Sequence, residues 1–141
     1  MSSLKKHSIT NFKLQSGKVI SLTLSYQIFG KELHEGPVVL VNHSLTGNSN
    51  VSGEDGWWSD IIGPKKLIDT EVYSVIAFNF PGNGTEDDFL TSYKDWILRD
   101  VSEIFKMALN EFGVSELFAA IGGSIGGALA WEMAVSHPNF I

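Results

Sequence analysis

A serine stands among glycines at the point where an apolar segment gives way to a helical pattern. The residues Gly122-Gly123-Ser124-Ile125-Gly126 fit the pattern G-x-S-x-G. In that pattern a strand reverses sharply into a helix, and the serine side chain is exposed above the sheet in a strained conformation. Glycines on either side let the strand and the helix approach where a Cβ would collide. The pattern therefore predicts that Ser124 is a nucleophile.

Two other roles are open to a glycine-rich turn: a purely structural strand–helix connection, or a phosphate-binding loop. The dinucleotide-binding pattern G-x-G-x-x-G, if it began at Gly122, would need glycine in place of Ser124. The pattern G-x-x-x-x-G-K-[ST] does not occur in the sequence. An apolar strand before the glycines and a helix after them favour the nucleophile.

A nucleophile of this kind needs a second backbone donor from the loop after an earlier core strand. The segment from His43 to Gly47 follows a buried apolar run and is the candidate loop. We expect the backbone N–H groups of Leu45 and Ile125 to form an oxyanion hole for Ser124. For His43, bracing of the loop by hydrogen bonds is favoured over catalysis.

The strands that must position these residues are visible in the hydrophobic pattern. Alternating apolar and polar residues in 11–30, on both sides of Ser16-Gly17, predict an antiparallel N-terminal hairpin. Continuous apolar runs at 38–41, 72–80 and 117–123 are typical of strands that are covered on both faces.

Two helices alternate with these strands. The first is predicted by an apolar stripe at spacings of three and four, and ends at Gly113. The stripe consists of Trp96, Ile97, Val101, Ile104, Phe105, Ala108, Leu109 and Phe112. The second follows Ser124 and ends before Pro138, which cannot continue a helix. Buried strands alternating with helices predict an α/β fold with a parallel core sheet.

Composition excludes several classes of protein. The 141 residues carry a net charge of −6, which gives no electrostatic support for nucleic-acid binding. There is no cysteine, so disulfides and thiolate metal sites are excluded. We expect no metal site at the acidic triplet 86–88, which is interpreted as a solvated turn. No secretory signal or membrane-spanning run is present, which makes a cytoplasmic location the default expectation.

Three stretches closely resemble the homoserine O-acetyltransferases of the α/β-hydrolase superfamily. They are "VNHSLTGNSNV", "GWWSDIIGPKKLIDTEVYSVIAFN" and "IGGSIGGALAWEMAVSHP". The family pattern runs H-A-L-T-G, then G-W-W with I-G-P-x-K-x-I-D-T, then G-G-S-M-G-G. Trp57-Trp58 and Asp69-Thr70 are its most distinctive matches, and the resemblance covers roughly residues 10 to 141. It implies an α/β-hydrolase fold.

The resemblance also implies an activity. Ser124 would take an acetyl group from acetyl-CoA and pass it to the hydroxyl of homoserine, a step of methionine biosynthesis. Acetyl-CoA would be a co-substrate, and no bound cofactor is implied. A homodimer is expected for the full-length enzyme. One departure is the segment after Asn79, which is shorter and more acidic than the family's glycine-rich segment and leaves the substrates open.

The general base is the larger departure. In α/β hydrolases the chain order is Ser, then Asp or Glu, then His. His137 lies 13 positions after Ser124 on the same predicted helix, roughly 20 Å away. Glu132 lies roughly 12 Å away, and packing or solvent contact is its expected role. Neither can reach the Ser124 hydroxyl.

The sheet is incomplete as well, because strand 117–121 would present an unpaired apolar edge. We therefore expect residues 1–141 to be the N-terminal part of a single α/β-hydrolase domain, inactive or nearly so alone. Its C-terminal strands and lid would be missing.

Alternative functions are a related esterase, an O-succinyltransferase on the same scaffold, or a non-catalytic interaction module that retains the turn. The module requires that the 141-residue chain be stable by itself.

Overall fold

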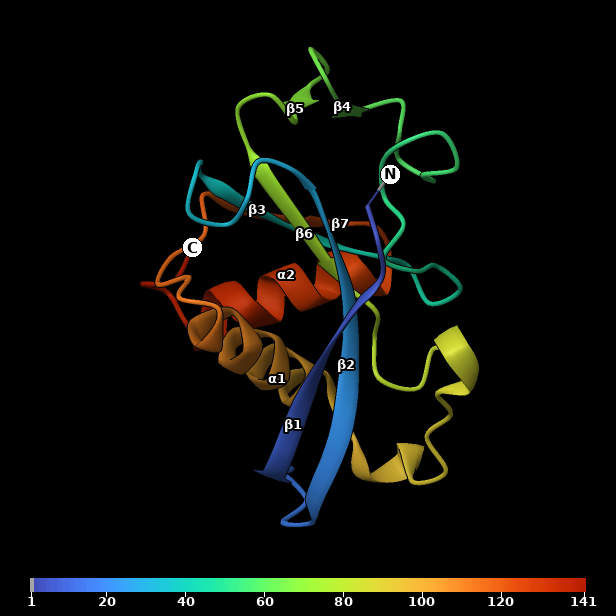
Figure 1. Ribbon diagram of the computed structural model, residues 1–141. Coiled ribbons are helices and arrows are strands. Elements are labelled where there is room, and N and C mark those ends of the chain that lie inside the picture. Colours follow the sequence, from blue (N-terminus) through green and yellow to red (C-terminus); the bar gives the residue numbers. More distant parts are fainter. Residues whose placement is uncertain (1) are drawn as a thin grey trace.

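The computed structural model describes residues 2–141, apart from the side chain of Asp87. A mixed five-stranded sheet carries two helices on one face (Figure 1). The strand order is β1-β2-β6-β3-β7, so the chain leaves the hairpin, crosses to β3 and returns to place β6 between them. This arrangement confirms the expected α/β fold, with a parallel core and an antiparallel N-terminal hairpin.

The N-terminal hairpin is the antiparallel part of the sheet. It consists of β1 (Lys5–Lys13) and β2 (Val19–Gly30). Gly17 adopts φ 93° in the turn, and its N–H donates to the carbonyl of Leu14. The hairpin confirms the alternating pattern, and β2 goes on to pair antiparallel with β6.

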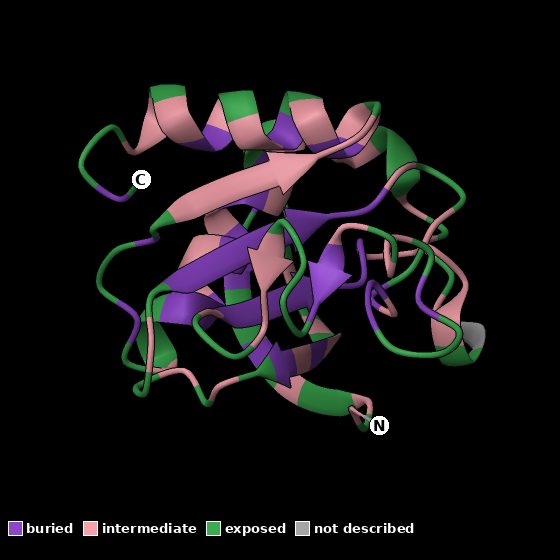
Figure 2. Ribbon diagram, turned by 90° about the horizontal axis from the view of Figure 1, so that it is seen from above, coloured by how far each residue is buried: buried purple, intermediate pink, exposed green. Residues whose placement is uncertain are grey.

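The three apolar runs form the strands β3 (Val38–Asn42), β6 (Ser74–Phe78) and β7 (Ala119–Gly122). β3 lies between the other two and is parallel to both. Every residue of β3 and β6 is buried, as the continuous apolar pattern predicted (purple in Figure 2). For the run 117–123 that prediction is wrong: β7 includes only residues 119–122, and all of them are partly exposed because β7 is the outermost described strand. The predicted strand 72–80 is shorter than expected. Its first two residues belong to a turn, because the N–H groups of Val72 and Tyr73 donate to the Asp69 carbonyl.

The helices α1 (Leu98–Glu111) and α2 (Ile125–Ser136) pack on the same face of the sheet. The expectation that Trp96 and Ile97 belong to the first helix is wrong. Ile97 is extended, and its N–H donates to Asp100 Oδ2 at 2.9 Å, which fixes the first turn of the helix one residue later. The other carboxylate oxygen of Asp100 accepts the N–H of Gln15 and ties the helix to the hairpin turn.

Two hydrophobic clusters lie on opposite faces of the sheet. The larger is formed between the helices and the sheet and includes Phe78, Phe105, Leu129 and Met133, all without exposed surface. The smaller lies on the other face, where residues 48–70 cover it. That segment contains a small parallel pair, β4 (Ile62–Gly63) and β5 (Ile68–Asp69), at the top of Figure 1. Neither helix within residues 2–141 has the length and apolar character needed to cross a bilayer.

One margin of the molecule is apolar and uncovered. Among the described residues β7 pairs only with β3, and all four of its residues are partly exposed (pink in Figure 2). Trp131 on the adjoining helix is 76% exposed. Residues 120–122 of β7, Trp131 and neighbouring small and aliphatic residues line a shallow hollow of about 430 Å³. The unpaired edge expected for this strand is therefore present.

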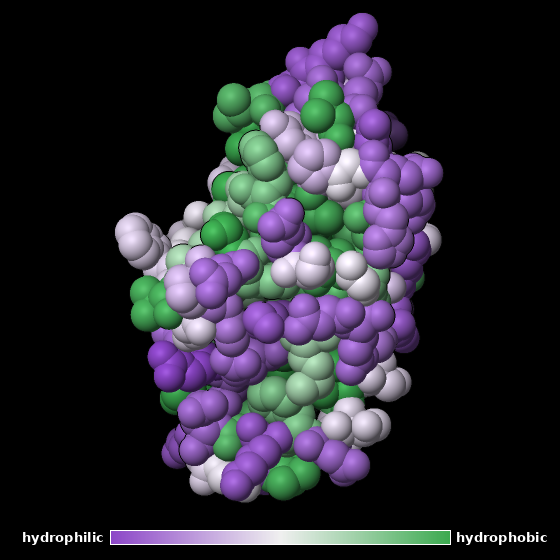
Figure 3. All heavy atoms as spheres, turned by 90° about the vertical axis from the view of Figure 1, so that its left-hand side faces the viewer, coloured by the Kyte–Doolittle hydropathy of each residue, from purple (hydrophilic) through white to green (hydrophobic). Residues whose placement is uncertain are grey.

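Figure 3 shows the side of the molecule that is on the left in Figure 1, where hydrophobic residues gather between hydrophilic ones.

Candidate functional site

Ser124 lies at the junction of β7 and α2. Its backbone has φ 56° and ψ −125°, a conformation that is costly for a residue with a Cβ. The Ser124 carbonyl accepts the N–H groups of Gly127 and Ala128 and so starts the helix. Its side chain caps no helix N–H and is exposed. The hydroxyl is therefore held above the carboxyl end of the sheet and is free to react.

Steric contacts show why glycine is needed on both sides of the serine. A Cβ on Gly126 would lie 2.2 Å from the carbonyl oxygen of Asn42, in the neighbouring strand β3. A Cβ on Gly122 would lie 2.3 Å from the carbonyl carbon of Gly126. A Cβ on Gly123 would meet nothing within 4 Å. The two glycines of the G-x-S-x-G pattern thus permit the close packing of β3, β7 and α2, whereas Gly123 is not required for space.

The two predicted oxyanion donors are placed by neighbouring strands. Asn42 pairs with Gly122 at the carboxyl ends of β3 and β7, and each predicted donor follows three residues later. The backbone N–H groups of Leu45 and Ile125 have no hydrogen-bond partner among residues 2–141. Unpartnered N–H groups near a helix N-terminus are suited to stabilise a developing negative charge. Their assignment as an oxyanion hole remains a prediction.

His43 holds the loop through hydrogen bonds to backbone groups, as expected from the sequence. Its side chain is fully buried, and Nε2 accepts the N–H of Phe80 at 3.0 Å while Nδ1 lies 2.6 Å from the Ser44 carbonyl. These partners require a neutral ring with its proton on Nδ1. Burial lowers the pKa of His43, which is consistent with a neutral ring. Both nitrogens are occupied, so His43 has none to offer to Ser124.

The other histidines lie away from Ser124. His7 is on β1, at the opposite edge of the sheet and roughly 19 Å away by strand spacing. His34 packs beside Gly113, at the C-terminal end of α1. His137 follows α2, and its Nε2 lies 2.9 Å from a carboxylate oxygen of Glu103. None of the histidines in residues 2–141 is thus placed as a general base for Ser124.

The carboxylate of Glu132 on α2 is hydrogen-bonded to two neighbouring side chains. Its Oε1 accepts Arg99 Nε at 2.8 Å and Ser136 Oγ at 2.7 Å, and the Arg99 bond is the main reason that the pKa of Glu132 is lowered. The contact joins α1 to α2 on the outside of the helix pair. Glu132 is therefore a surface partner of Arg99.

The acidic segment after β6 forms a short 3₁₀ turn, Thr85–Asp87. Glu86 pairs with Lys6 at 2.5 Å, and Asp88 Oδ2 accepts the N–H of Gly82 at 3.0 Å. The expectation for the side chain of Asp87 lies outside the described residues. Across the described part of the chain, no three potential ligands from His, Asp or Glu are grouped as a metal site would require.

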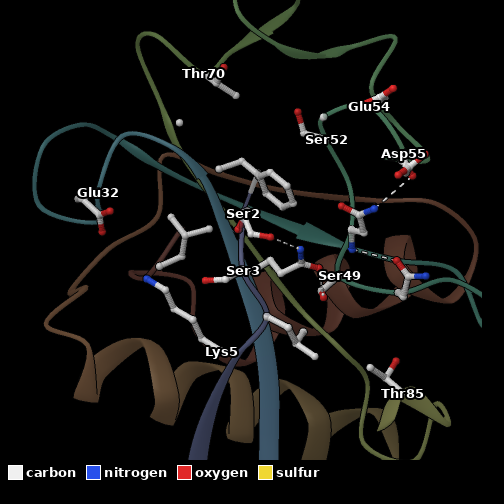
Figure 4. A pocket seen from close by; sticks show the side chains of 18 residues that line it. Ser2, Ser3, Lys5, Glu32, Ser49, Ser52, Glu54, Asp55, Thr70 and Thr85 are labelled. Atoms are coloured by element: carbon white, nitrogen blue, oxygen red, sulfur yellow. Dashed lines mark hydrogen bonds between the residues drawn. The ribbon is translucent and has the colours of Figure 1, made fainter.

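A polar cavity lies elsewhere. It has a volume of about 890 Å³ and is lined mainly by polar residues of β2, the N-terminal segment and the loop 48–55 (Figure 4). In its wall Gln27 Nε2 donates to the Ser2 carbonyl and Gln27 Oε1 accepts Ser49 Oγ. Ser124 does not line it. The strained serine and the unpartnered amides lie outside this cavity, at the end of β7, where the sequence predicts the reactive site.

Comparison with known proteins agrees with this geometry. Residues 37–141 match the family described as alpha/beta hydrolase fold. The chain belongs to the α/β-hydrolase fold family. In α/β hydrolases the nucleophile stands at such a turn between a strand and a helix, which is the place of Ser124 between β7 and α2.

The α/β hydrolase is similar to proteins of several activities. A homoserine O-acetyltransferase from Haloarcula marismortui is 33% identical over 95% of this chain and 39% of its own length. The crystal structure of a homoserine O-acetyltransferase from Bacillus anthracis matches with a TM-score of 0.90 at 24% identity, over all of this chain and 45% of that one. Esterase E22 matches with a TM-score of 0.87 at 26% identity, over all of this chain and 46% of its own.

These similarities confirm the resemblance to the homoserine O-acetyltransferases that the sequence motifs indicated. The chain spans less than half the length of each of these proteins.

Proposed function

We propose that this chain carries the nucleophile of an acyltransferase, and that Ser124 is that nucleophile. One observation carries the proposal: a strained, exposed serine follows β7, and two unpartnered backbone N–H groups, those of Leu45 and Ile125, follow the carboxyl ends of the paired strands β3 and β7. An acyl carbonyl attacked by Ser124 would place its developing oxyanion against these donors. Such stabilisation is worth about 10²- to 10³-fold in rate for one donor.

The names of the relatives favour acetyl transfer to homoserine. In this reaction Ser124 Oγ attacks the thioester carbonyl of acetyl-CoA, the C–S bond breaks, and coenzyme A leaves as the thiol. The hydroxyl of homoserine then attacks the acetyl-serine, which forms O-acetylhomoserine and restores Ser124. Both steps need a base to take and return a proton, and no histidine of residues 2–141 is placed to act as that base. We therefore expect the chain itself to react slowly, and with activated acyl donors.

Covalent labelling tests the nucleophile. We expect p-nitrophenyl acetate to add one acetyl group to the chain, and peptide mapping to place it on Ser124. The variant Ser124→Ala should lose the label, whereas Ser115→Ala, at another exposed serine, should keep it. Acetylation that persists in Ser124→Ala would remove this serine from the mechanism. A folded wild-type chain that is never acetylated would favour the non-catalytic module.

A second candidate is an esterase, which the similarity to esterase E22 favours. Both functions share the acetyl-serine and differ in what removes it. The fate of labelled acetyl-Ser124 separates them: release that is accelerated by homoserine and gives an O-acetyl product supports the transferase, and release to acetate at a rate independent of homoserine supports the esterase. Competition between acetyl-CoA and succinyl-CoA for Ser124 identifies the preferred acyl group.

A further inference from the structure

Two consecutive residues at the carboxyl end of β6 hold both ends of the loop 43–49. Phe80 donates its N–H to His43 Nε2 at 3.0 Å, at the start of the loop. Asn79 accepts the N–H of Ser49 on Oδ1 at 2.8 Å, at the end of the loop. Between these two points lies Leu45, the predicted oxyanion donor. The loop is therefore fixed from the neighbouring strand and not from the strand that carries the serine.

Asn79 uses all the hydrogen-bonding capacity of its side chain. Oδ1 also accepts Asn83 Nδ2 at 3.1 Å and Thr85 Oγ1 at 3.3 Å. Nδ2 donates to Ser25 Oγ at 2.9 Å and to Ser49 Oγ at 3.0 Å. The residue is 3% exposed, so water cannot readily replace these partners. Only an amide offers this combination of acceptor and two donors at one site.

The first end of the loop is held with similar firmness. The ring of His43 packs against Phe80 with centroids 4.4 Å apart, in addition to the hydrogen bond from the Phe80 N–H. Its Nδ1 is hydrogen-bonded to the next carbonyl, that of Ser44, at 2.6 Å. The neutral ring thus joins the chain at 43–44 to the chain at 80.

The loop needs such anchors because its centre is not packed. Leu45 is 72% exposed, and within the loop the N–H of Gly47 bonds to the Ser44 carbonyl. A backbone donor stabilises an oxyanion only when it lies about 2.7–3.1 Å from it, so the loop must be held in place. Besides a long bond from Asn83 Nδ2 to the Gly47 carbonyl, at 3.4 Å, the anchors of the loop are at its two ends. Those ends are His43 and Ser49.

We propose that Asn79 is a positioning residue for acyl transfer, which together with His43 fixes the loop 43–49 and thereby the Leu45 amide. The inference rests on the proposed role of Leu45 as an oxyanion donor. Asn79 contacts no substrate in this proposal. It acts through the loop, and its effect is on the transition state rather than on substrate binding.

Hydrogen exchange tests the loop without any need for activity. In the wild-type chain, local opening of the loop must break the hydrogen bond from the Ser49 N–H to Asn79. Asn79→Ala removes that cost, so we expect the protected amides of Gly47 and Val51 to exchange at least about tenfold faster. Amides within α2 serve as the internal reference and should be unchanged. The matched control is Ser44→Ala, which removes a hydroxyl from the same loop, takes away none of the partners of Asn79, and should leave Gly47 protected.

The rate of Ser124 acetylation tests the catalytic consequence. Measured against p-nitrophenyl acetate concentration, the saturating rate of Asn79→Ala should fall by roughly ten- to a hundredfold, less than the loss of a whole donor. The half-saturating concentration should stay the same, because the oxyanion exists only in the transition state. If Asn79→Ala does not fold, His43→Gln cuts the other anchor and should show the same pattern.

The outcomes separate this proposal from the proposed function. Unchanged exchange at Gly47 and Val51 overturns the role of Asn79, whatever Ser124 does. Faster exchange with an unchanged saturating rate overturns the positioning role as well. A wild-type chain that is not acetylated refutes the proposed nucleophile, and the exchange data then decide by themselves whether Asn79 fixes the loop.

Discussion

Replacement of Gly126 by alanine probes the packing beneath the candidate site. The added Cβ would lie 2.2 Å from the Asn42 carbonyl oxygen and 2.6 Å from that of His43, whereas ordinary contacts begin at 3.4 Å. Both atoms belong to the backbone and cannot turn away. The first turn of α2 must therefore move away from β3 by roughly 1 Å, since a close-packed interior cannot absorb the overlap.

The cost can be worked from what the helix buries. Leu129 and Met133 of α2 have no exposed surface, and full burial of each contributes about 1.5–3 kcal/mol. A gap of up to 1 Å forfeits about a quarter to a half of such contacts, and overpacking strain adds about 1–3 kcal/mol. We therefore expect Gly126→Ala to lower the free energy of unfolding by roughly 3 kcal/mol, or the melting temperature by about 10 °C.

Urea unfolding followed by circular dichroism measures this loss. Gly123→Ala is the matched control, because its Cβ would meet nothing within 4 Å and its φ is not positive. Its free energy of unfolding should stay within about 0.5 kcal/mol of wild type. If both variants unfold at the same urea concentration, the close approach of α2 to β3 is refuted. Failure of Gly126→Ala alone to fold would agree with it.

Backbone strain, protonation and burial give three more expectations. Ser124→Gly should raise the free energy of unfolding by about 1 kcal/mol, because glycine adopts the positive φ without strain. Ser124→Ala should not raise it, and equal free energies of unfolding for the two variants would contradict the strain. Because burial lowers the pKa of His43, the unfolded chain takes up its proton first, and stability should fall as the pH drops below about 6.5. His43→Gln should weaken that pH dependence, and an identical slope in both proteins would argue against a buried neutral ring. In urea unfolding, Phe105→Ala should lower the free energy of unfolding by about 3–5 kcal/mol, because Phe105 is fully buried. Replacement of the exposed Trp131 by alanine should change it by no more than about 0.5 kcal/mol, and similar losses in the two variants would contradict this difference in burial.

Local pattern was enough to predict the N-terminal hairpin, the three apolar strands, the two α-helices and the turn at Ser124, but not β4, β5 or the 3₁₀ turns. The alternation around Ser16-Gly17 predicted the hairpin, and the two glycines of the G-x-S-x-G pattern, Gly122 and Gly126, are the ones that steric contacts require. Both features depend on neighbours in the sequence or on a single tight turn. For that reason they are visible in the sequence itself.

Long-range pairing could not be predicted in this way. Nothing in the run 72–80 shows that β6 lies between β2 and β3, because a continuous apolar pattern records burial and not the identity of the neighbours. The hydrogen bonds of Asn79 were missed for the same reason. The only signal was an amide directly after a fully apolar strand, and its partners Ser25 and Ser49 lie 54 and 30 positions away. The start of α1 was also missed. The apolar stripe predicted a helix that includes Trp96 and Ile97, whereas the Asp100 side chain accepts the Ile97 N–H and the helix begins at Leu98.

The place of β7 at the margin of the sheet also bears on how the chain folds. Its four residues pair only with β3 among those described, so the other four strands of the sheet can assemble before β7 is added. During synthesis the N-terminal elements emerge first, and pairing of β2, β6 and β3 needs nothing beyond residue 78. The elbow would then form after these strands, against a frame that already exists. The strain at Ser124 would be imposed late, on a chain whose native register is set, which keeps it from competing with the early steps of folding.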